Sequence, residues 1–198
     1  MELFHGISDM ALSSTIEAGI GFLLLALFLY FLMIYNNLVR LKVDIDKAWA
    51  NVDVLLKQRH DEVPNLAAAV AGVRDFEKNV MTQITQARSA AQGAQTLSEK
   101  SQTEGALSSS LNRLFAVAEN YPDLKAQDNF LKLQKRLSEI ENEISDRRSF
   151  YNDSVAAYNA RTQEFPDSIL ASSFGFKPRE LFHLEDSQKA PVAVGFSS

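Results

Sequence analysis

An uncharged stretch from Ala18 to Val39 passes, with no turn signal, into a long helical pattern that begins at Tyr35. As an α-helix this stretch would be about 33 Å long, which is sufficient for a hydrocarbon core of about 30 Å. Its most apolar part is Ile20–Ile34. The sequence therefore predicts one membrane span whose helix continues directly into the domain that follows.

The charges on either side of this stretch predict its orientation. The N-terminal flank carries acidic residues but no Lys or Arg, and no small-residue cleavage pattern follows the stretch, which argues against a secretory signal peptide. Arg40, Lys42 and Lys47 follow it, so the positive-inside rule places the N-terminus outside and the domain in the cytoplasm. These basic residues would also attract anionic headgroups, although Asp44 and Asp46 dilute their charge.

The composition narrows the chemistry that the chain can perform. Its 198 residues include no Cys and carry a formal net charge of −5. The absence of Cys excludes disulfides, thiolate metal sites and cysteine nucleophiles. Basic and acidic residues are interleaved, so we expect no nucleic-acid partner. The sequence also lacks the common phosphate-loop, dinucleotide-binding and zinc-protease motifs, so we expect no catalytic residue, no metal site and no cofactor.

The pattern divides the chain into four parts. Ser14–Glu17 has the form of a capping box, in which Ser14 would start the membrane helix. From Gly175 onward the chain carries Gly, Pro and Ser with little periodicity, so we expect it to be mostly extended or disordered. The expected parts are a short extracytoplasmic N-terminus (1–13), a transmembrane helix (14–39), a helical bundle (36–176) and a C-terminal tail (177–198).

The first helix beyond the span has the apolar pattern of a coiled coil. Apolar or small residues recur at steps of three and four from Leu41 to Leu55, and again from Val63 to Ala87. Between these runs the pattern takes two steps of four through Arg59, and Pro64 lies in the same place. Because proline removes a backbone donor and clashes with the preceding turn, we expect a kink or a break near Asp61–Pro64.

The next segments predict a loop and a shorter helix. Gly93 and then Ser98–Gly105 are polar and rich in turn-forming residues, so we expect a loop there. The shorter helix follows, with Leu107, Leu111 and Leu114 on one face. Tyr121–Asp123 should stop this helix, and Asp123 should cap the next one.

The last long helix has the clearest apolar period and is expected from Lys125 to Glu164, ended by Pro166. A short helical turn is expected at Asp167–Phe174. The apolar stripe of the long helix runs through Phe130, Leu133, Leu137, Ile140, Ile144, Arg147, Tyr151, Val155, Tyr158 and Phe165. Two long helices with a shorter one between them predict an all-α fold, in which the transmembrane helix continues into an elongated antiparallel helical bundle.

Several short sequence blocks stand out when they are taken together: Tyr35-Asn36-x-Leu38-Val39, Ala48-Trp49-Ala50-Asn51-Val52, Arg59-His60-Asp61-Glu62-Val63-Pro64-Asn65-Leu66, Tyr121-Pro122-Asp123-Leu124, Tyr151-Asn152, Tyr158-Asn159, Phe165-Pro166 and Phe174-Gly175-Phe176. In this combination they resemble the LemA family of bacterial membrane proteins over roughly residues 35 to 186. The resemblance implies a single N-terminal span in the bacterial inner membrane, a helical cytoplasmic domain and no established enzymatic activity. The chain departs from the family pattern at Glu62 and in the alanines at 67–69.

The polar run Arg59–Glu62 beside the expected bend is the first candidate site. His60 and two carboxylates suggest a metal or proton site, but adjacent helical residues point about 100° apart and would not converge on one ion. We favour structural roles, with Asp61 capping a helix that restarts at Pro64.

Aromatic and amide residues supply the other candidates. Trp49 lies one position away from the apolar pattern, which favours core packing over an exposed anchor for a partner. Tyr151-Asn152 recurs seven residues later as Tyr158-Asn159, so each residue type follows one stripe. We expect the two asparagines to form hydrogen bonds across the bundle and to fix helix register, in preference to binding a ligand.

These features favour a membrane-anchored helical scaffold without catalytic activity. The expected partners are the lipid bilayer, further copies of the chain as a homo-oligomer, and an unidentified membrane or cytoplasmic protein. The alternative is a regulatory adaptor of a membrane protease or sensor system. A metal-dependent enzyme is a remote third reading.

Overall fold

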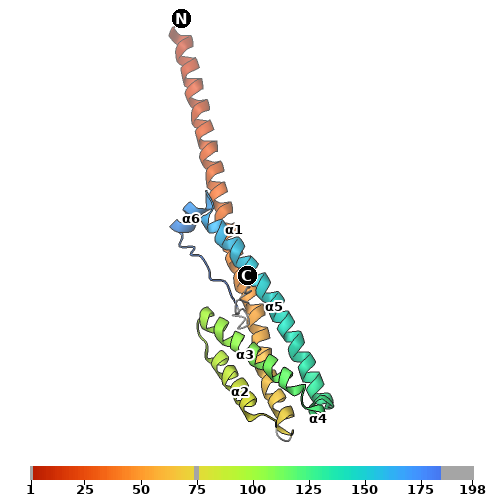
Figure 1. Cartoon of the computed structure of the whole chain (residues 1–198). Helices are drawn as coiled ribbons and strands as arrows, with labels where there is room; N and C mark the ends of the chain where they lie inside the picture. The colour runs from red at the N-terminus through yellow and green to blue at the C-terminus, as the bar shows by residue number, and fades with distance from the viewer. Residues whose placement is uncertain (1, 74–75, 184–198) are drawn as a thin grey trace, which may run out of the picture. The chain divides into compact units, whose positions relative to one another are not determined.

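The computed structural model describes residues 2–73 and 76–183, and it describes side chains from Ile16 onward. The described residues are helical or irregular and contain no strand, which confirms the all-α prediction (Figure 1). The helices are α1 (Glu2–Ala71), α2 (Lys78–Gly93), α3 (Leu97–Ala118), α4 (Pro122–Lys125), α5 (Asp128–Gln163) and α6 (Asp167–Ser173).

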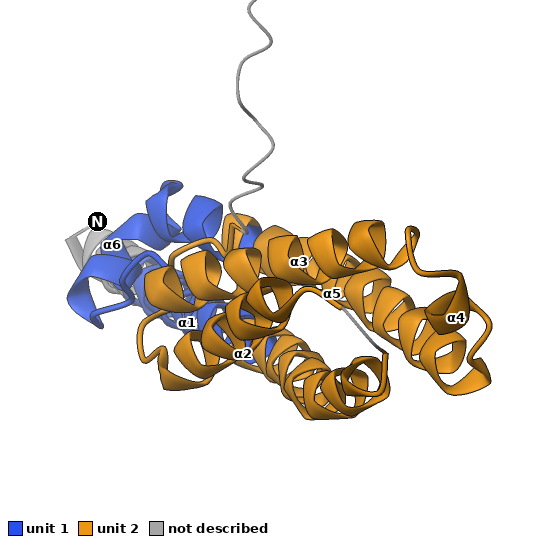
Figure 2. Ribbon diagram, turned by 60° about the horizontal axis from the view of Figure 1, so that its bottom comes forward, with its two compact units in different colours: residues 1–44, 157–179 blue, residues 45–156, 180–198 orange. Residues whose placement is uncertain are grey.

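The chain forms two compact units (Figure 2). Unit 1 contains Met1–Asp44 and Ala157–Arg179, and unit 2 contains Ile45–Ala156 and Glu180–Ser198. Each unit therefore contains part of α1 and part of α5.

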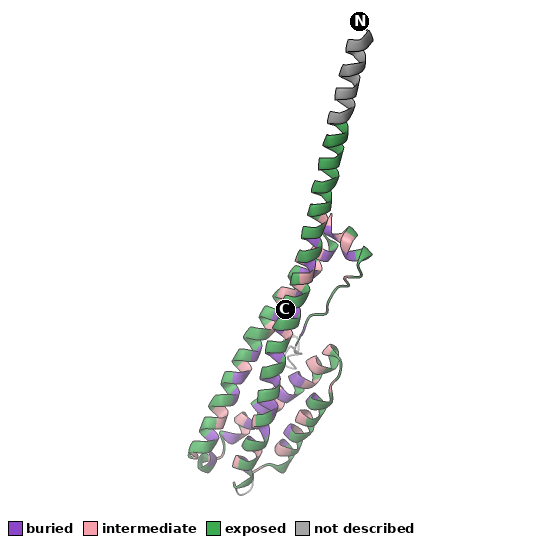
Figure 3. Ribbon diagram, turned by 180° about the vertical axis from the view of Figure 1, so that it is seen from behind, coloured by how far each residue is buried: buried purple, intermediate pink, exposed green. Residues whose placement is uncertain are grey.

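Within unit 1, α1 carries the apolar segment. The part of α1 that begins at Ile16 is long and apolar enough to cross a membrane, and most of its large side chains up to Met33 are exposed (Figure 3). Phe22, for example, is 76% exposed. The helix begins at Glu2, so the prediction that Ser14 caps its start is wrong. Once a helix is nucleated, each further residue adds a hydrogen bond at little cost in free energy. Helix α1 therefore extends N-terminal to Ser14, and no cap is needed there.

Of the kink or break expected near Asp61–Pro64, the break is wrong, because α1 continues through Pro64 to Ala71. Proline cannot donate the helical hydrogen bond to the carbonyl oxygen of His60, four residues earlier. The side chain of Arg88 on α2 takes over this role, since its Nε donates to that oxygen at 2.7 Å. The chain turns instead between α1 and α2, and the expected single helix from Val63 to Ala87 is two helices.

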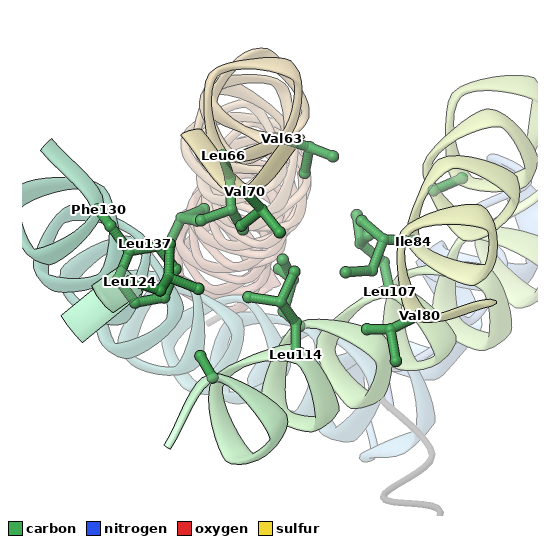
Figure 4. Packing of buried hydrophobic residues seen from close by; sticks show 13 residues of the cluster. Val63, Leu66, Val70, Val80, Ile84, Leu107, Leu114, Leu124, Phe130 and Leu137 are labelled. Atoms are coloured by element: carbon green, nitrogen blue, oxygen red, sulfur yellow. The ribbon is translucent and has the colours of Figure 1, made fainter. Parts of the chain in front are cut away.

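The core of unit 2 combines side chains from five helices (Figure 4). The apolar stripe expected on α1 is buried here, and it meets residues of α2, α3, α4 and α5. Burial of such side chains contributes about 1.5–3 kcal/mol each. The central members are Val63, Leu66, Val70, Val80, Ile84, Leu107, Leu111, Leu114, Leu124, Phe130 and Leu137.

The predicted loop at Ser98–Gly105 is also wrong, because this segment forms the first turns of α3. Thr96 caps α3 through a reciprocal box with Glu99: the Glu99 amide donates to Thr96 Oγ1 at 3.1 Å, and the Thr96 amide donates to Glu99 Oε2 at 3.0 Å. This box satisfies donors that a helix start would otherwise leave unpaired. The connection between α2 and α3 is therefore limited to residues 94–96.

The expected long helix is present as α5, but it begins at Asp128. Asp123 does not cap it, because Asp123 lies in the first turn of the short helix α4. Most of the predicted stripe is buried, while Arg147 and Phe165 are exposed. Pro166 follows the end of α5, as predicted, and the peptide bond between Phe165 and Pro166 is cis.

Helix α6 packs on α1 within unit 1. Ile34 and Leu38 are buried in a cluster with Ala171. Tyr35 makes edge contacts with Phe174 and Phe176, at 5.1 and 5.8 Å between ring centroids. Gly175 separates these two aromatic residues with a φ of +73°, which favours glycine. The short helix predicted at Asp167–Phe174 is thus present and covers one face of α1.

Candidate interaction site

A buried arginine lies at the centre of unit 2. Arg59 occupies the stripe position between Leu55 and Val63 on α1, and its side chain is fully buried. The sequence pattern marked this position only as an irregular step. An arginine in an otherwise apolar stripe needs carboxylate partners from the facing helices, because an unpaired buried charge is costly.

Those partners come from α3 and α5. The guanidinium of Arg59 forms ion pairs with Glu104 and with Glu141, and it donates to Ser108 Oγ at 2.6 Å. Ser108 Oγ in turn lies 3.2 Å from both carboxylate oxygens of Glu141. The network therefore joins α1, α3 and α5 of unit 2 through one cation.

His60 extends the network toward the surface. Its Nε2 atom lies 2.9 Å from Glu104 Oε1, so Glu104 is placed between His60 and Arg59. Burial alone raises the pKa of Glu104, but the hydrogen bond from His60 and the positive charge of Arg59 outweigh burial and hold the pKa below its ordinary value. Glu104 is therefore a carboxylate at neutral pH.

A polar pocket of about 330 Å³ lies beside this network in unit 2. Asp53, Lys57 and His60 line it from α1, and Lys100 and Glu104 line it from α3. The C-terminal end of α2 and the connection that follows it complete the wall. Both signs of charge are present on its wall. Such a wall suits a polar or zwitterionic group, for example a segment of polypeptide.

Lys100, which lines the same pocket, also contacts Trp49. Lys100 Nζ is 3.0 Å from Asp53 Oδ1 and 5.2 Å from the centre of the indole ring. The indole makes edge contacts with Tyr151 and Phe182, at 5.5 and 5.3 Å between ring centroids. Trp49 is therefore partly buried in an aromatic group, and Lys100, which lies over its ring, lines the pocket.

The asparagine repeat binds the C-terminal segment. In unit 2, Asn152 Nδ2 donates to the carbonyl oxygen of Phe182 at 3.1 Å, and the amide of Phe182 donates to Asn152 Oδ1 at 2.8 Å. In unit 1, Asn159 makes the same pair of bonds with the backbone of Arg179, at 2.9 and 2.8 Å. The expected hydrogen bonds from these asparagines across to another helix are therefore wrong, since both bind extended backbone.

The tyrosines of the repeat are buried next to their asparagines. The hydroxyl of Tyr151 donates to the carbonyl oxygen of Glu180 at 3.0 Å in unit 2. Tyr158, in unit 1, is 1% exposed, and this burial raises its pKa despite the nearby positive charge of Arg179. The described part of the C-terminal tail, up to residue 183, is thus attached to α5 through side chains of the repeat.

The other two candidates lie apart from these contacts. Asp61 and Pro64 are exposed, and Asp61 caps no helix because α1 continues past it. Among the described residues, no group of three potential metal-binding side chains is present, so the structure does not assemble His60, Asp61 and Glu62 into a metal site. Sequence reasoning missed Glu104, Glu141 and Phe182, which complete the site.

Comparisons with known proteins place these residues in a family. The model of the LemA family matches residues 48–196. Magnetosome proteins MamQ 1 and MamQ 2 of Paramagnetospirillum magneticum are each 25% identical over 187 residues, covering 81% of this chain and 69% of the relative. Protein LemA of Metamycoplasma hominis is 25% identical over 162 residues, covering 79% of this chain and 72% of the relative. The network, the pocket and the asparagine repeat all lie inside the matched range.

Proposed function

The chain belongs to the LemA family, and on this premise we propose that it is a membrane-anchored helical scaffold that self-associates or organises partner proteins at the inner membrane. In this proposal the apolar segment of α1 crosses the membrane and the helical domain lies in the cytoplasm. The chain catalyses no reaction. The names of the family and of the relatives describe no reaction either, which supports this part of the proposal.

One observation carries the proposal. The same helix, α1, contains an exposed apolar segment in unit 1 and a buried stripe in the core of unit 2. No linker separates these two parts along the chain. Exposed apolar side chains over such a length require a lipid or protein environment.

The oligomeric state of the full-length protein tests the scaffold. The protein is purified in detergent and reconstituted into vesicles, and its mass is measured by light scattering and by crosslinking. The scaffold predicts oligomers that persist on dilution and vesicles whose size or curvature changes with protein density. A protein that is strictly monomeric in both environments, on vesicles of unchanged shape, would contradict it.

A regulatory adaptor is the second candidate, and the mixed-charge pocket beside Trp49 supports it. A photo-crosslinking amino acid at position 92 would face this pocket, whereas one at position 86 lies on the same helix outside it. Mass spectrometry of crosslinked cells should find one partner protein from position 92 only. Recovery of nothing except self-crosslinks from position 92 would eliminate the adaptor.

A further inference from the structure

Helix α6 lies beside the inner end of the proposed membrane span. Leu170 and Ala171 pack on Ile34 and Leu38 of α1 within unit 1. Val39 is the last residue of the uncharged stretch and Arg40 is the first charge after it. Ile34 therefore lies about 8 Å, along the helix axis, inside the end of the span. An element packed at this level would be at the boundary between headgroups and acyl chains.

Three large apolar side chains in and next to α6 are exposed. Phe165, Ile169 and Phe174 are 82%, 53% and 61% exposed, and we call these three residues the lipid-facing patch. Isolated exposed apolar residues are ordinary, but three on a short segment next to an exposed span indicate a shared apolar environment. The patch continues the apolar surface that α1 already presents.

Three polar side chains of α6 have partners within unit 1. The hydroxyls of Ser172 and Ser173 donate to the carbonyl oxygen of Ile169, at 2.9 and 2.8 Å. Asp167 is 3% exposed, and its carboxylate lies 3.0 Å from Nε of Arg161. Internal pairing of this kind lowers the cost of placing a segment at an apolar boundary.

A basic pocket of about 570 Å³ adjoins the span on α1. Leu29, Leu32 and Met33 line its apolar part, while Arg40 and Arg161 line its polar part. All of these residues belong to unit 1. Arg161 is already paired with Asp167 at 3.0 Å and with Glu164 at 3.7 Å, so Arg40 is the main candidate for a headgroup contact. Apolar walls that end at this guanidinium match the shape of a phospholipid, because guanidinium groups bind phosphate.

We propose that unit 1 carries a second membrane-contacting surface, in which the lipid-facing patch enters the acyl region and the basic pocket receives a phospholipid headgroup. This inference rests on the proposed membrane anchorage of α1. The ligand is a bilayer phospholipid with an anionic headgroup. Free phosphate shares the charged group but lacks the acyl chains that the apolar walls would contact.

Depth-dependent fluorescence quenching tests the patch in the full-length protein. Trp49→Phe removes the only tryptophan, and a single tryptophan is then introduced by Phe174→Trp, Phe150→Trp or Leu25→Trp. Phe150 is a matched control, because it is 58% exposed on α5 within unit 2. The variants are reconstituted into vesicles of phosphatidylcholine and phosphatidylglycerol that contain lipids brominated at defined depths.

Leu25→Trp distinguishes a failure of the proposed membrane anchorage of α1 from a failure of the second membrane-contacting surface. Quenching at position 25 by deeply brominated lipid supports the anchorage, and its absence contradicts the proposed function itself. With position 25 quenched, we expect lipid brominated near the headgroup to reduce emission from position 174 at least twofold more than emission from position 150. Equal quenching at positions 174 and 150 would overturn the second surface while leaving the anchor intact.

Lipid selectivity tests the pocket. Arg40→Gln removes a guanidinium from the pocket, and Lys132→Gln removes an exposed charge on α5 in unit 2 as a control. We expect Arg40→Gln to reduce the phosphatidylglycerol retained in detergent at least threefold relative to phosphatidylcholine, with little change for Lys132→Gln. Equal losses in both variants, or displacement of the lipid by millimolar inorganic phosphate alone, would overturn the headgroup site.

Discussion

Arg88 supplies the hydrogen bond that Pro64 cannot make, because its Nε donates to the carbonyl oxygen of His60 at 2.7 Å. A side chain of α2 therefore replaces one backbone donor of α1. This explains why α1 continues past a residue that commonly ends helices. It also couples the position of α2 to the continuity of α1 within unit 2.

The coupling predicts a double-mutant cycle. Arg88→Met should lower the free energy of unfolding by about 1–3 kcal/mol, since a buried carbonyl loses its donor. In a Pro64→Ala background the new backbone amide can bond to His60, so the effect of Arg88→Met should be smaller by about 1 kcal/mol. Urea unfolding measures all four proteins. If Arg88→Met had equal effects in both backgrounds, Arg88 would not be replacing the backbone donor that Pro64 lacks.

The charge network predicts a larger loss at Arg59. Arg59→Ala should lower the free energy of unfolding by about 3–5 kcal/mol, because Glu104 would remain buried and charged after losing its guanidinium partner. Arg147→Ala on the exposed face of α5 is the control and should change stability by less than about 0.5 kcal/mol. Similar midpoints in urea for both variants would show that the network contributes little.

The lowered pKa of Glu104 predicts acid destabilisation of unit 2. In the unfolded chain this carboxyl should titrate near its ordinary value of 4.5, above its pKa in the folded protein. The stabilisation is then fully present above the unfolded value and is lost as the pH falls through the folded value. Stability measured between pH 3 and 7 should fall on the acid side, and Glu104→Gln should weaken that dependence. An unchanged pH profile in the variant would assign the acid sensitivity to other groups.

The asparagine repeat predicts a local effect on the C-terminal segment. Asn152→Asp retains the acceptor for the Phe182 amide but removes the donor to the Phe182 carbonyl. Hydrogen exchange at residues 180–183 should therefore speed up at least threefold, with α1 and α3 little changed. Asn142→Asp, an exposed change on the same helix, should have no such effect. Unchanged exchange at 180–183 would show that other contacts hold the segment.

The ring contact between Phe182 and Trp49 predicts how the fluorescence of Trp49 responds when Phe182 is replaced. Phe182→Ala removes a fully buried ring that touches the indole and should cost about 3–5 kcal/mol. The emission of Trp49 should shift to longer wavelength as water reaches the ring. Leu181→Ala, at a neighbouring residue that is 41% exposed, should leave the emission unchanged. An unshifted spectrum for Phe182→Ala would place the indole in a different environment.

Periodicity predicted the helices whose apolar stripes are long. The stripes on α1 and α5 were read correctly because burial repeats every three or four residues over many turns. Glu104 was missed since it lies in a polar segment whose local composition resembles a loop, while the Thr96–Glu99 box makes it helical. Composition therefore predicted a loop in a segment whose helix depends on its N-terminal cap.

The candidate residues were better predicted than their partners. Asn152 and Asn159 were recognised from their spacing of seven, but the spacing cannot show whether an amide faces another helix or an extended segment. Phe182 lies in a segment without periodicity, so nothing in the sequence marked it as core. Its burial depends on Trp49, far away in the chain, and such contacts leave no local pattern.

The contact between Trp49 and Phe182 also fixes the order of events during synthesis. Translation delivers Trp49 well before Phe182, so the aromatic group of unit 2 stays open until residue 182 has left the ribosome. Until then the indole lacks the ring of Phe182, and Asn152 lacks its two backbone partners. Exposed apolar surface of this kind is what chaperones and proteases recognise in a chain that has not finished folding.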